Sequence, residues 1–369
     1  MSARKRRRGY YGITLYATWS QYDVPTYLAE DNKIMVGHYP QKYVGDELNA
    51  ELETALTSAS NLVATGNVYT VDVDTRNNNS YSLLGNPRTI HYVALEEYFY
   101  LKDGVGVKYA RLPYEYVKAV NQNQHYYKFT TSNDELVVRD EHPDAYWFEV
   151  QPIPCTVMRT TADVNNTLLT VVSDVVLGSH SFNYANGKAD SEDFYSRLEW
   201  ASNPEIRKFL NGSDSVLYRL NDEEEGSERA LAGLYSEALE GASPKIVQAT
   251  IKNQKIADPT LEYSVDGDGN IDENYSTTDY VWIPSVYEFG QLVDKKARVT
   301  DLGRATYSKM FSDTDSRSYY WLRSACFNET KNQETPYYVA LTDLYNDLAP
   351  TWSLFSVRIC FAIDMKEPS

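Results

Sequence analysis

The chain has 369 residues, and 42% of them are hydrophobic, which is enough to bury a large core. The 52 acidic residues outnumber the 35 basic ones, and the formal net charge of −17 argues against nucleic-acid binding by the body of the protein. No stretch approaches the roughly 18 apolar residues of a membrane span, and no lipidation motif is present, so we expect no membrane insertion.

The N-terminal segment differs in charge from the rest of the chain. Its basic residues are Arg4, Lys5, Arg6, Arg7 and Arg8. Residues 9–21 contain no apolar stretch, so we expect no secretory signal peptide. A basic arm suits phosphate groups or an acidic groove on a partner, and a solvated tail is the alternative interpretation. We predict that residues 1–32, a basic arm followed by an extended aromatic segment, bind other proteins of an assembly.

Residues 33–150 are predicted to be mainly β-structure with one helix. Leucines at positions 48, 52 and 56 recur at helical spacing and predict a helix over Gly45–Leu56. Asp103–Gly104 indicates a hairpin turn, which makes Gly104 and Gly106 turn residues rather than a phosphate-binding loop. The predicted strands are Lys33–His38, Asn67–Val73, Thr89–Leu101, Val105–Leu112, Ala145–Val150 and Ile153–Arg159.

Residues 151–363 mix strands with short helices. Leu168–Val176 is an apolar run of strand length, and Asn211–Gly212 is a typical helix end. The predicted helices are Asp190–Asn211, a helix from the acidic run at 222–225 through Leu239, Pro284–Val293 and Leu302–Met310. Because no βαβ alternation appears, we predict an α+β fold with a mainly antiparallel sheet, in one elaborated domain over 33–363 with a tail at 364–369.

The C-terminal stretch Tyr319–Ile363 combines a hydrophobic frame with polar connections. The frame residues are Tyr320, Trp321, Leu322, Val339, Leu341, Phe355, Val357, Ile359, Phe361 and Ile363. The segment between Phe327 and Trp352 is too polar for a core and rich in Tyr and Asn, which dominate binding loops because they give contact area with few rotors. The predicted ligand-binding residues are Tyr319, Asn328, Thr330, Asn332, Thr335, Tyr337, Tyr338, Tyr345, Asn346 and Trp352.

Candidates for chemistry are few. Cys155, Cys326 and Cys360 lack metal-site spacing and resemble small buried hydrophobes. His180 between two serines has no glycine elbow, so a catalytic role is not expected. We therefore predict neither a cofactor nor a metal. The acidic residues Asp266, Asp268 and Asp272 match the middle of a calcium loop but not its ends, and an acidic hairpin tip is the other interpretation.

Several spaced motifs, in order, resemble a bacterial and phage domain family of unknown function. The matching residues are Val36, Gly37, Tyr39, Pro40 and Gln41; the helix 46–56; Tyr146, Trp147, Phe148, Glu149, Pro152 and Ile153; Trp200, Ser202, Ile206, Arg207, Phe209, Leu210 and Asn211; Thr278, Asp279, Tyr280, Val281, Trp282, Ile283, Pro284, Ser285 and Glu288; Trp321, Leu322, Arg323 and Ser324; Val357 and Arg358. Cys155 stands where the family usually has Trp. The resemblance implies a C-type-lectin-like fold that displays a C-terminal ligand face, without a catalytic set. Within it, we expect Trp321 and Leu322 to pack and Arg323 to pair internally.

Our leading hypothesis is a non-enzymatic phage virion protein that decorates the particle or recognises a host-surface protein or glycan. Such a protein leaves the cell by lysis and needs no signal peptide, and we expect it to form homo-oligomers. The first alternative is a cellular lectin-like binding protein, cytoplasmic or at the cell surface. Its C-terminal region could be diversified by a retroelement, since Asn, Tyr, Asp and Ser are products of randomised adenine-rich codons. The second is an oxidase related to formylglycine-type enzymes, which would use Cys326 and Cys360.

Overall fold

The fold is described from a computed structural model of the chain. The structure describes residues 27–28, 32–58, 61–74, 90–116, 125–128, 135–138, 143–162, 167–182, 200, 204–212, 217–219, 228–230, 233–242, 245–251, 255–256, 276–292, 294–295, 297–306, 320–326, 338–342, 346–350 and 354–365. The basic arm, the acidic loop at 266–272 and most of the predicted ligand-binding residues lie outside these ranges.

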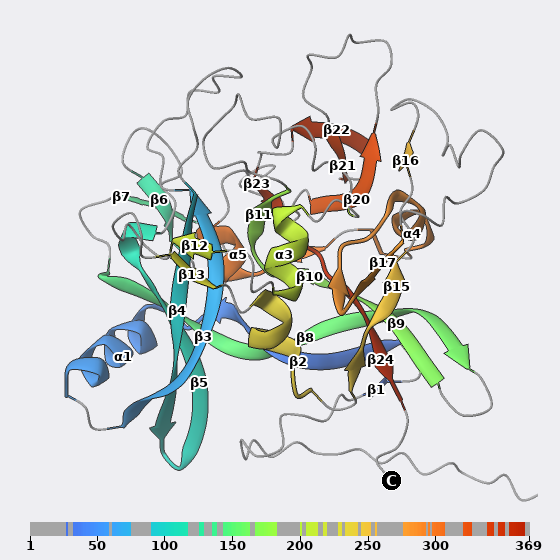
Figure 1. Cartoon of the computed structure of the whole chain (residues 1–369). Helices are drawn as coiled ribbons and strands as arrows, with labels where there is room; N and C mark the ends of the chain where they lie inside the picture. Colours follow the sequence, from blue (N-terminus) through green and yellow to red (C-terminus); the bar gives the residue numbers. More distant parts are fainter. Residues whose placement is uncertain are drawn as a thin grey trace, which may run out of the picture.

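A large antiparallel sheet crosses the molecule (Figure 1). Its path runs β14–β24–β9–β8–β5–β4–β3. These strands are β3 Leu62–Asp74, β4 Ile90–Lys102, β5 Val105–Pro113, β8 Ala145–Ala162, β9 Thr167–Ser173, β14 Ile246–Val247 and β24 Cys360–Asp364. β2 Lys33–Tyr43 pairs with β8 and with β1 Tyr27–Leu28, while β18 Val281–Trp282 pairs with β24. The predicted α+β class with a mainly antiparallel sheet is confirmed.

β8 joins the two halves of this sheet. β2 follows one edge of β8 from Phe148 to Thr156. The other edge is shared, because β5 pairs with Ala145–Glu149 and β9 pairs with Cys155–Ala162. The prediction of two strands, Ala145–Val150 and Ile153–Arg159, is therefore wrong, since one strand continues through two prolines. A register shift in β2 accommodates Pro152 between its paired neighbours, and bulges are where a strand tolerates proline.

The helix α1, Asp46–Ser58, covers the outer half of the sheet. Leu52 is fully buried against Tyr100 and Trp147, while Leu48 and Leu56 pack at its margin, as their spacing predicted. Asn49 fixes the helix to β8, because its amide donates to the Ala145 carbonyl and accepts from the Trp147 N–H, at 3.0 and 2.9 Å.

The β4–β5 hairpin confirms the predicted turn. Asp103 and Gly104 have φ values of 53° and 79°. Two successive residues with positive φ are characteristic of the type I′ turn, whose twist matches that of the flanking strands. Gly106 is needed for a different reason, because a Cβ there would lie 2.0 Å from the Phe99 ring. Both glycines therefore have structural roles.

The remaining helices are short. They are the 3₁₀ turn η2 Tyr114–Tyr116, α3 Glu205–Asn211, the π-helix η5 Tyr235–Leu239, α4 Val286–Gln291 and α5 Asp301–Thr306. The predicted helix over Asp190–Asn211 is too long, because Pro204 is extended at its N-cap, whereas the predicted end is confirmed by Gly212, with φ 74°. The predicted helix through Leu239 is also too long, because Gly233 has φ 84°, outside the right-handed helical region.

Short strand pairs complete the fold. They are β6 His125–Lys128 with β7 Glu135–Val138, β12 Leu217–Arg219 with β13 Glu228–Ala230, β15 Ala249–Ile251 with β17 Thr277–Asp279, and the parallel pair β10 Val175–Val176 with β19 Arg298–Val299. One hydrophobic cluster includes buried residues from Ile34 to Ile363, and a second lies beneath α1. The core thus joins both ends of the predicted domain.

Candidate ligand-binding face

A second sheet, which we call the display sheet, carries the C-terminal region. Its strands are β11 Ser179–Ser181, β16 Lys255–Ile256, β20 Tyr320–Cys326, β21 Tyr338–Thr342, β22 Asn346–Pro350 and β23 Leu354–Ser356. The order is β11–β23–β20–β21–β22, and β16 pairs in parallel with β20. β20, β21, β22 and β16 lie on the side of the molecule away from β2 and β8 (Figure 1).

The described frame residues are buried. Tyr320, Trp321 and Leu322 of β20 are at most 1% exposed, and Phe355, Val357, Ile359, Phe361 and Ile363 are at most 5% exposed. Phe361 and Ile363 belong to β24 of the large sheet, and the side chains of Val339 and Leu341 lie outside the described part. The Trp321 ring meets Phe355 edge-on at 4.9 Å, and its indole N–H donates to the His180 carbonyl at 2.6 Å. The prediction that Trp321 and Leu322 pack is confirmed, and the frame is a rigid base.

Arg323 pairs internally, also as predicted. Its guanidinium donates to the Glu288 carboxylate and to the Ile283 carbonyl, the latter at 2.9 Å. Glu288 is held in place by a capping box, in which the Ser285 hydroxyl accepts from the Glu288 N–H and the Glu288 carboxylate accepts from the Ser285 N–H. Arg323 therefore joins β20 to the start of α4, which leaves it unsuited to ligand binding.

The register of the display sheet divides the predicted ligand-binding residues into two groups. Tyr338 pairs with Cys326 on one side and with Pro350 on the other, and Ile256 lies beside Cys326. We call this end of the strands, marked by Ile256, Cys326, Tyr338 and Pro350, the display end. The connection 327–337 begins and ends there, the connection 351–353 begins there, and so does the connection 257–275 that contains the acidic loop.

Tyr338 lies at the display end. In the sequence, the connections attached there contain six more of the predicted residues, namely Asn328, Thr330, Asn332, Thr335, Tyr337 and Trp352. At the opposite end, Tyr320 pairs with Thr342, and Thr342 pairs with the predicted residue Asn346. In the sequence, Tyr319 directly precedes Tyr320 and Tyr345 directly precedes Asn346. Of the ten predicted residues, the structure describes Tyr338 at the display end and Asn346 at the opposite end, and the other eight lie outside the described ranges and stay predictions.

Some of the residues that carry the family resemblance meet in one hydrogen-bond network. The Asp279 carboxylate accepts from the Trp200 indole and from the Arg207 guanidinium, each at 2.8 Å. The Asn211 side chain accepts from the backbone N–H of Tyr280 and Val281 and donates to the Val281 carbonyl. These motif residues connect α3 to β17 and β18, so they have a structural role rather than forming a ligand site.

Arg358 is a second motif residue with a structural role. It is 1% exposed, and it donates to the Ser173 and Asp294 carbonyls and to the Tyr320 hydroxyl. The guanidinium carbon also lies 5.3 Å from the centre of the Tyr320 ring. Carbonyl dipoles and an aromatic face stabilise this buried cation, and no carboxylate of the described residues pairs with it within 4.0 Å.

The candidate nucleophiles are buried. Cys155 and Cys360 are free thiols with 0% exposure, and burial raises the pKa of each well above its usual value. A thiol of this kind stays protonated and unreactive, which removes Cys360 from the oxidase hypothesis, while the Cys326 side chain lies outside the described part. His180 is fully buried and lies 4.5 Å from Phe209 between ring centroids, as a core residue does.

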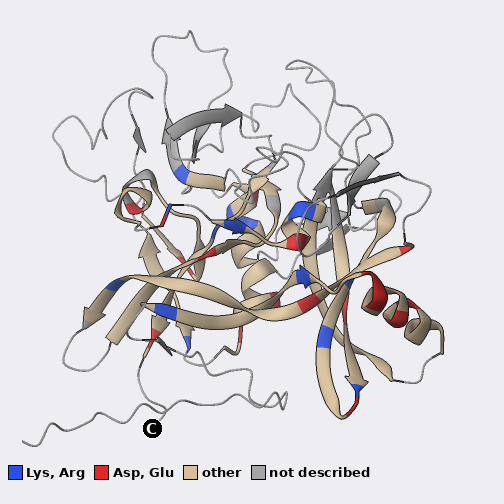
Figure 2. Cartoon of the chain, turned by 180° about the vertical axis from the view of Figure 1, so that it is seen from behind, with Lys and Arg blue, Asp and Glu red and all other residues tan. Residues whose placement is uncertain are grey.

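Charge is distributed unevenly over the described surface. Acidic side chains are concentrated on α1, which carries Asp46, Glu47, Glu51 and Glu53 and no basic residue (Figure 2). Three of them are used within the fold, since Glu53 accepts from Arg111 at 2.8 Å, Glu51 accepts from Lys102 at 2.5 Å and Asp46 accepts from the Tyr43 hydroxyl at 3.0 Å. Burial alone would raise the pKa of Glu53, but hydrogen bonds from Arg111 and Trp147 lower it.

No group of three or more His, Cys, Asp or Glu side chains among the described residues is arranged to hold a metal ion. In the same part of the chain, no helix is long and apolar enough to cross a bilayer. The predicted calcium loop is outside that part and stays a prediction. Comparison with family models, with curated proteins and with solved structures finds no match.

Proposed function

We propose that the protein is a non-enzymatic binding protein whose ligand contacts the display end of the display sheet. The observation that carries this proposal is the register of β16, β20, β21 and β22, which attaches three connections to one edge. Of these, 327–337 is rich in Tyr, Asn and Thr. Tyr provides contact area at low entropic cost, and the other types provide hydrogen bonds.

The buried frame supports the same proposal. Binding loops lose less entropy on binding when they are attached to a rigid base, and β20 is held by the packing of Trp321 and by the pairing of Arg323. We assign the ligand contacts to Tyr338 and to the six predicted residues within the connections 327–337 and 351–353, which begin at the display end. We do not assign ligand contacts to the remaining three residues, Tyr319, Tyr345 and Asn346, and their substitution serves as a control in the binding assay.

The test is a binding assay of the purified protein against a panel of intact bacterial strains and surface glycans. We expect the double variant Asn332→Ala, Tyr337→Ala to bind at least about tenfold more weakly, as central aromatic contacts do. The matched variant Tyr345→Ala, at the opposite end, keeps binding within about twofold. Equal losses in both variants, or no binding partner in the panel, would contradict the proposal.

The finer proposal is that the protein belongs to a phage particle and attaches through residues 4–8 of its basic arm. A basic segment next to an acidic body favours attachment to an acidic surface of a neighbouring protein. We expect washed particles to contain the chain in stoichiometric amounts and the native mass to be that of a homo-oligomer. A monomer that is absent from particles would favour the cellular binding protein, which has the same display end.

A further inference from the structure

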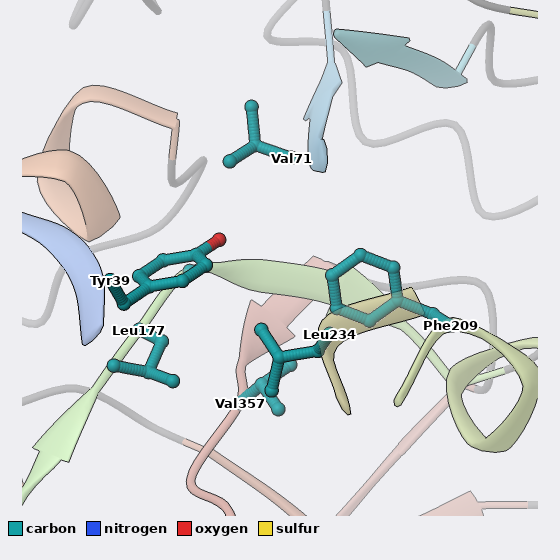
Figure 3. A pocket seen from close by; sticks show the side chains of 7 residues that line it. Tyr39, Val71, Leu177, Phe209, Leu234 and Val357 are labelled. Atoms are coloured by element: carbon teal, nitrogen blue, oxygen red, sulfur yellow. The ribbon is translucent and has the colours of Figure 1, made fainter. Parts of the chain in front are cut away.

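A small apolar cavity lies where β2, β3, α3 and η5 meet (Figure 3). Its walls are Tyr39, Val71, Leu177, Phe209, Leu234 and Val357, together with the backbone of Gly178. The volume is about 10 Å³, enough for one water molecule. No charged side chain lines it, so the cavity suits an uncharged occupant.

Tyr39 is the polar group of this cavity. Its side chain is 1% exposed, and its hydroxyl points into the space between Val71, Leu234 and Phe209 (Figure 3). Among the residues that the structure describes, it has no hydrogen-bond partner. Burial, and then the charge of Glu237, raises the pKa of Tyr39, so the hydroxyl is a donor throughout the physiological range. This donor faces an apolar cavity without an acceptor, and a ligand with one acceptor would pair with it.

Two walls of the cavity are joined by a single side chain. Glu237 of η5 accepts from the backbone N–H of Thr70 at 2.7 Å and from the Thr70 hydroxyl at 2.6 Å. Thr70 precedes Val71, and Glu237 lies three residues after Leu234, so the contact holds these two walls together. No Lys or Arg of the described residues pairs with Glu237 within 4.0 Å.

We propose that this cavity is a binding pocket for a small uncharged molecule with an apolar body and one hydrogen-bond acceptor, and that the Glu237–Thr70 contact controls its opening. Tyr39 donates to the acceptor, and Val71, Leu234 and Phe209 contact the apolar body. A molecule larger than water requires the Leu234 wall to move away from Val71. The Glu237–Thr70 contact resists that movement.

Protonation of Glu237 affects this movement. Burial raises the pKa of Glu237 to about 7, although the Thr70 hydrogen bonds lower it. The charge of Glu237 helps to raise the pKa of Tyr39 on β2 and of Tyr69 on β3. Of the other charged groups nearby, Glu97 is bound to Tyr69, and Arg207 of α3 is paired with Asp279. An ionised Glu237 gains solvation when η5 moves away from β3, so the open form is more populated above pH 7 than below it.

The experiment uses methyl NMR of the full chain with cyclopentanone, which has an apolar ring and one acceptor. We expect saturable shifts confined to the methyl groups of Val71, Leu177, Leu234 and Val357. Tyr39→Phe keeps the ring and loses the donor, so cyclopentanone binds about tenfold more weakly while cyclopentane binds unchanged. Gly178→Ala places a methyl group 4.0 Å from the Tyr39 hydroxyl and weakens binding of both probes.

Variants of Glu237 test the control of opening. In the wild type, cyclopentanone affinity rises from pH 6 to pH 8, because the open fraction rises. Glu237→Gln keeps both contacts without a charge, because the Gln oxygen accepts from the Thr70 N–H and the Gln amide donates to the Thr70 hydroxyl oxygen. Its affinity therefore does not vary with pH, and Glu237→Ala binds most tightly at both values. Shifts that do not saturate, that spread over other methyl groups, or that persist in Gly178→Ala would overturn the proposal.

Discussion

Two carboxylates bind different parts of β3, Glu97 fully buried and Glu237 half-buried, and the surroundings of the two differ. In the outer half, Glu97 is paired with Lys108 at 3.0 Å and accepts from Tyr69, Thr65 and Asn67. In the inner half, the two donors of Thr70 are the hydrogen-bond partners of Glu237 among the residues that the structure describes. Burial would raise the pKa of both, but the donors around Glu97 lower its pKa, whereas burial prevails at Glu237. The number of partners, rather than burial, decides which carboxylate is charged at neutral pH.

Removing the cation of the outer half has the largest expected effect. Lys108→Met leaves Glu97 fully buried without its charge partner, and we expect a loss of about 3–5 kcal/mol in the free energy of unfolding at pH 7. Urea denaturation measures this change. The control is Lys102→Met, whose exposed pair with Glu51 we expect to leave unfolding unchanged. A similar midpoint for both variants would show that Glu97 does not depend on Lys108.

A substitution at Gly37, where β2 contacts η5, has a smaller expected effect on the free energy of unfolding. Gly37 has φ 53°, and a Cβ there would lie 2.2 Å from the Ala238 carbonyl oxygen. We expect Gly37→Ala to cost about 2–3 kcal/mol, because strain and a clash add. Gly45→Ala is the control, since Gly45 also has positive φ but nothing within 4 Å, and costs about 1 kcal/mol. Equal thermal stability of the two variants would contradict the close approach.

The charge of Glu237 has the smallest expected effect and the clearest pH dependence. Its pKa is higher in the folded chain than in the unfolded chain, so folding favours the protonated form. Stability therefore decreases as pH rises from about 4.5 to about 7. Glu237→Gln removes this contribution and is more stable than the wild type at pH 8 by about 1–2 kcal/mol, allowing for partial exposure. Denaturation of both proteins at pH 5 and pH 8 measures it, and an unchanged difference between the two pH values would refute it.

The sequence correctly predicts the elements that depend on interactions between neighbouring residues. The leucine spacing of α1 and the turn at Asp103–Gly104 were found because helical periodicity and positive φ depend on neighbouring residues. The helix ends were less accurate at α3 and η5. There, Pro204 and Gly233 interrupt the helical geometry, so the described helices begin after these residues. The sequence predicts two strands in place of β8, because Pro152 normally interrupts a strand. The register shift that accommodates Pro152 lies in β2, which is distant in the sequence.

For the candidate site, the sequence identified the frame and the polar connections by composition alone. The tertiary structure showed which end of the display sheet each connection is attached to, because the strand register places Tyr338 and Asn346 at opposite ends. It also assigned Arg207, Asn211 and Asp279 to internal hydrogen bonds. Glu237 gave no signal in the sequence, because its environment is built by Thr70, which lies 167 residues away. Hydrophobic pattern and turn chemistry act between neighbours, whereas the partners of a buried polar group are known only once distant segments meet.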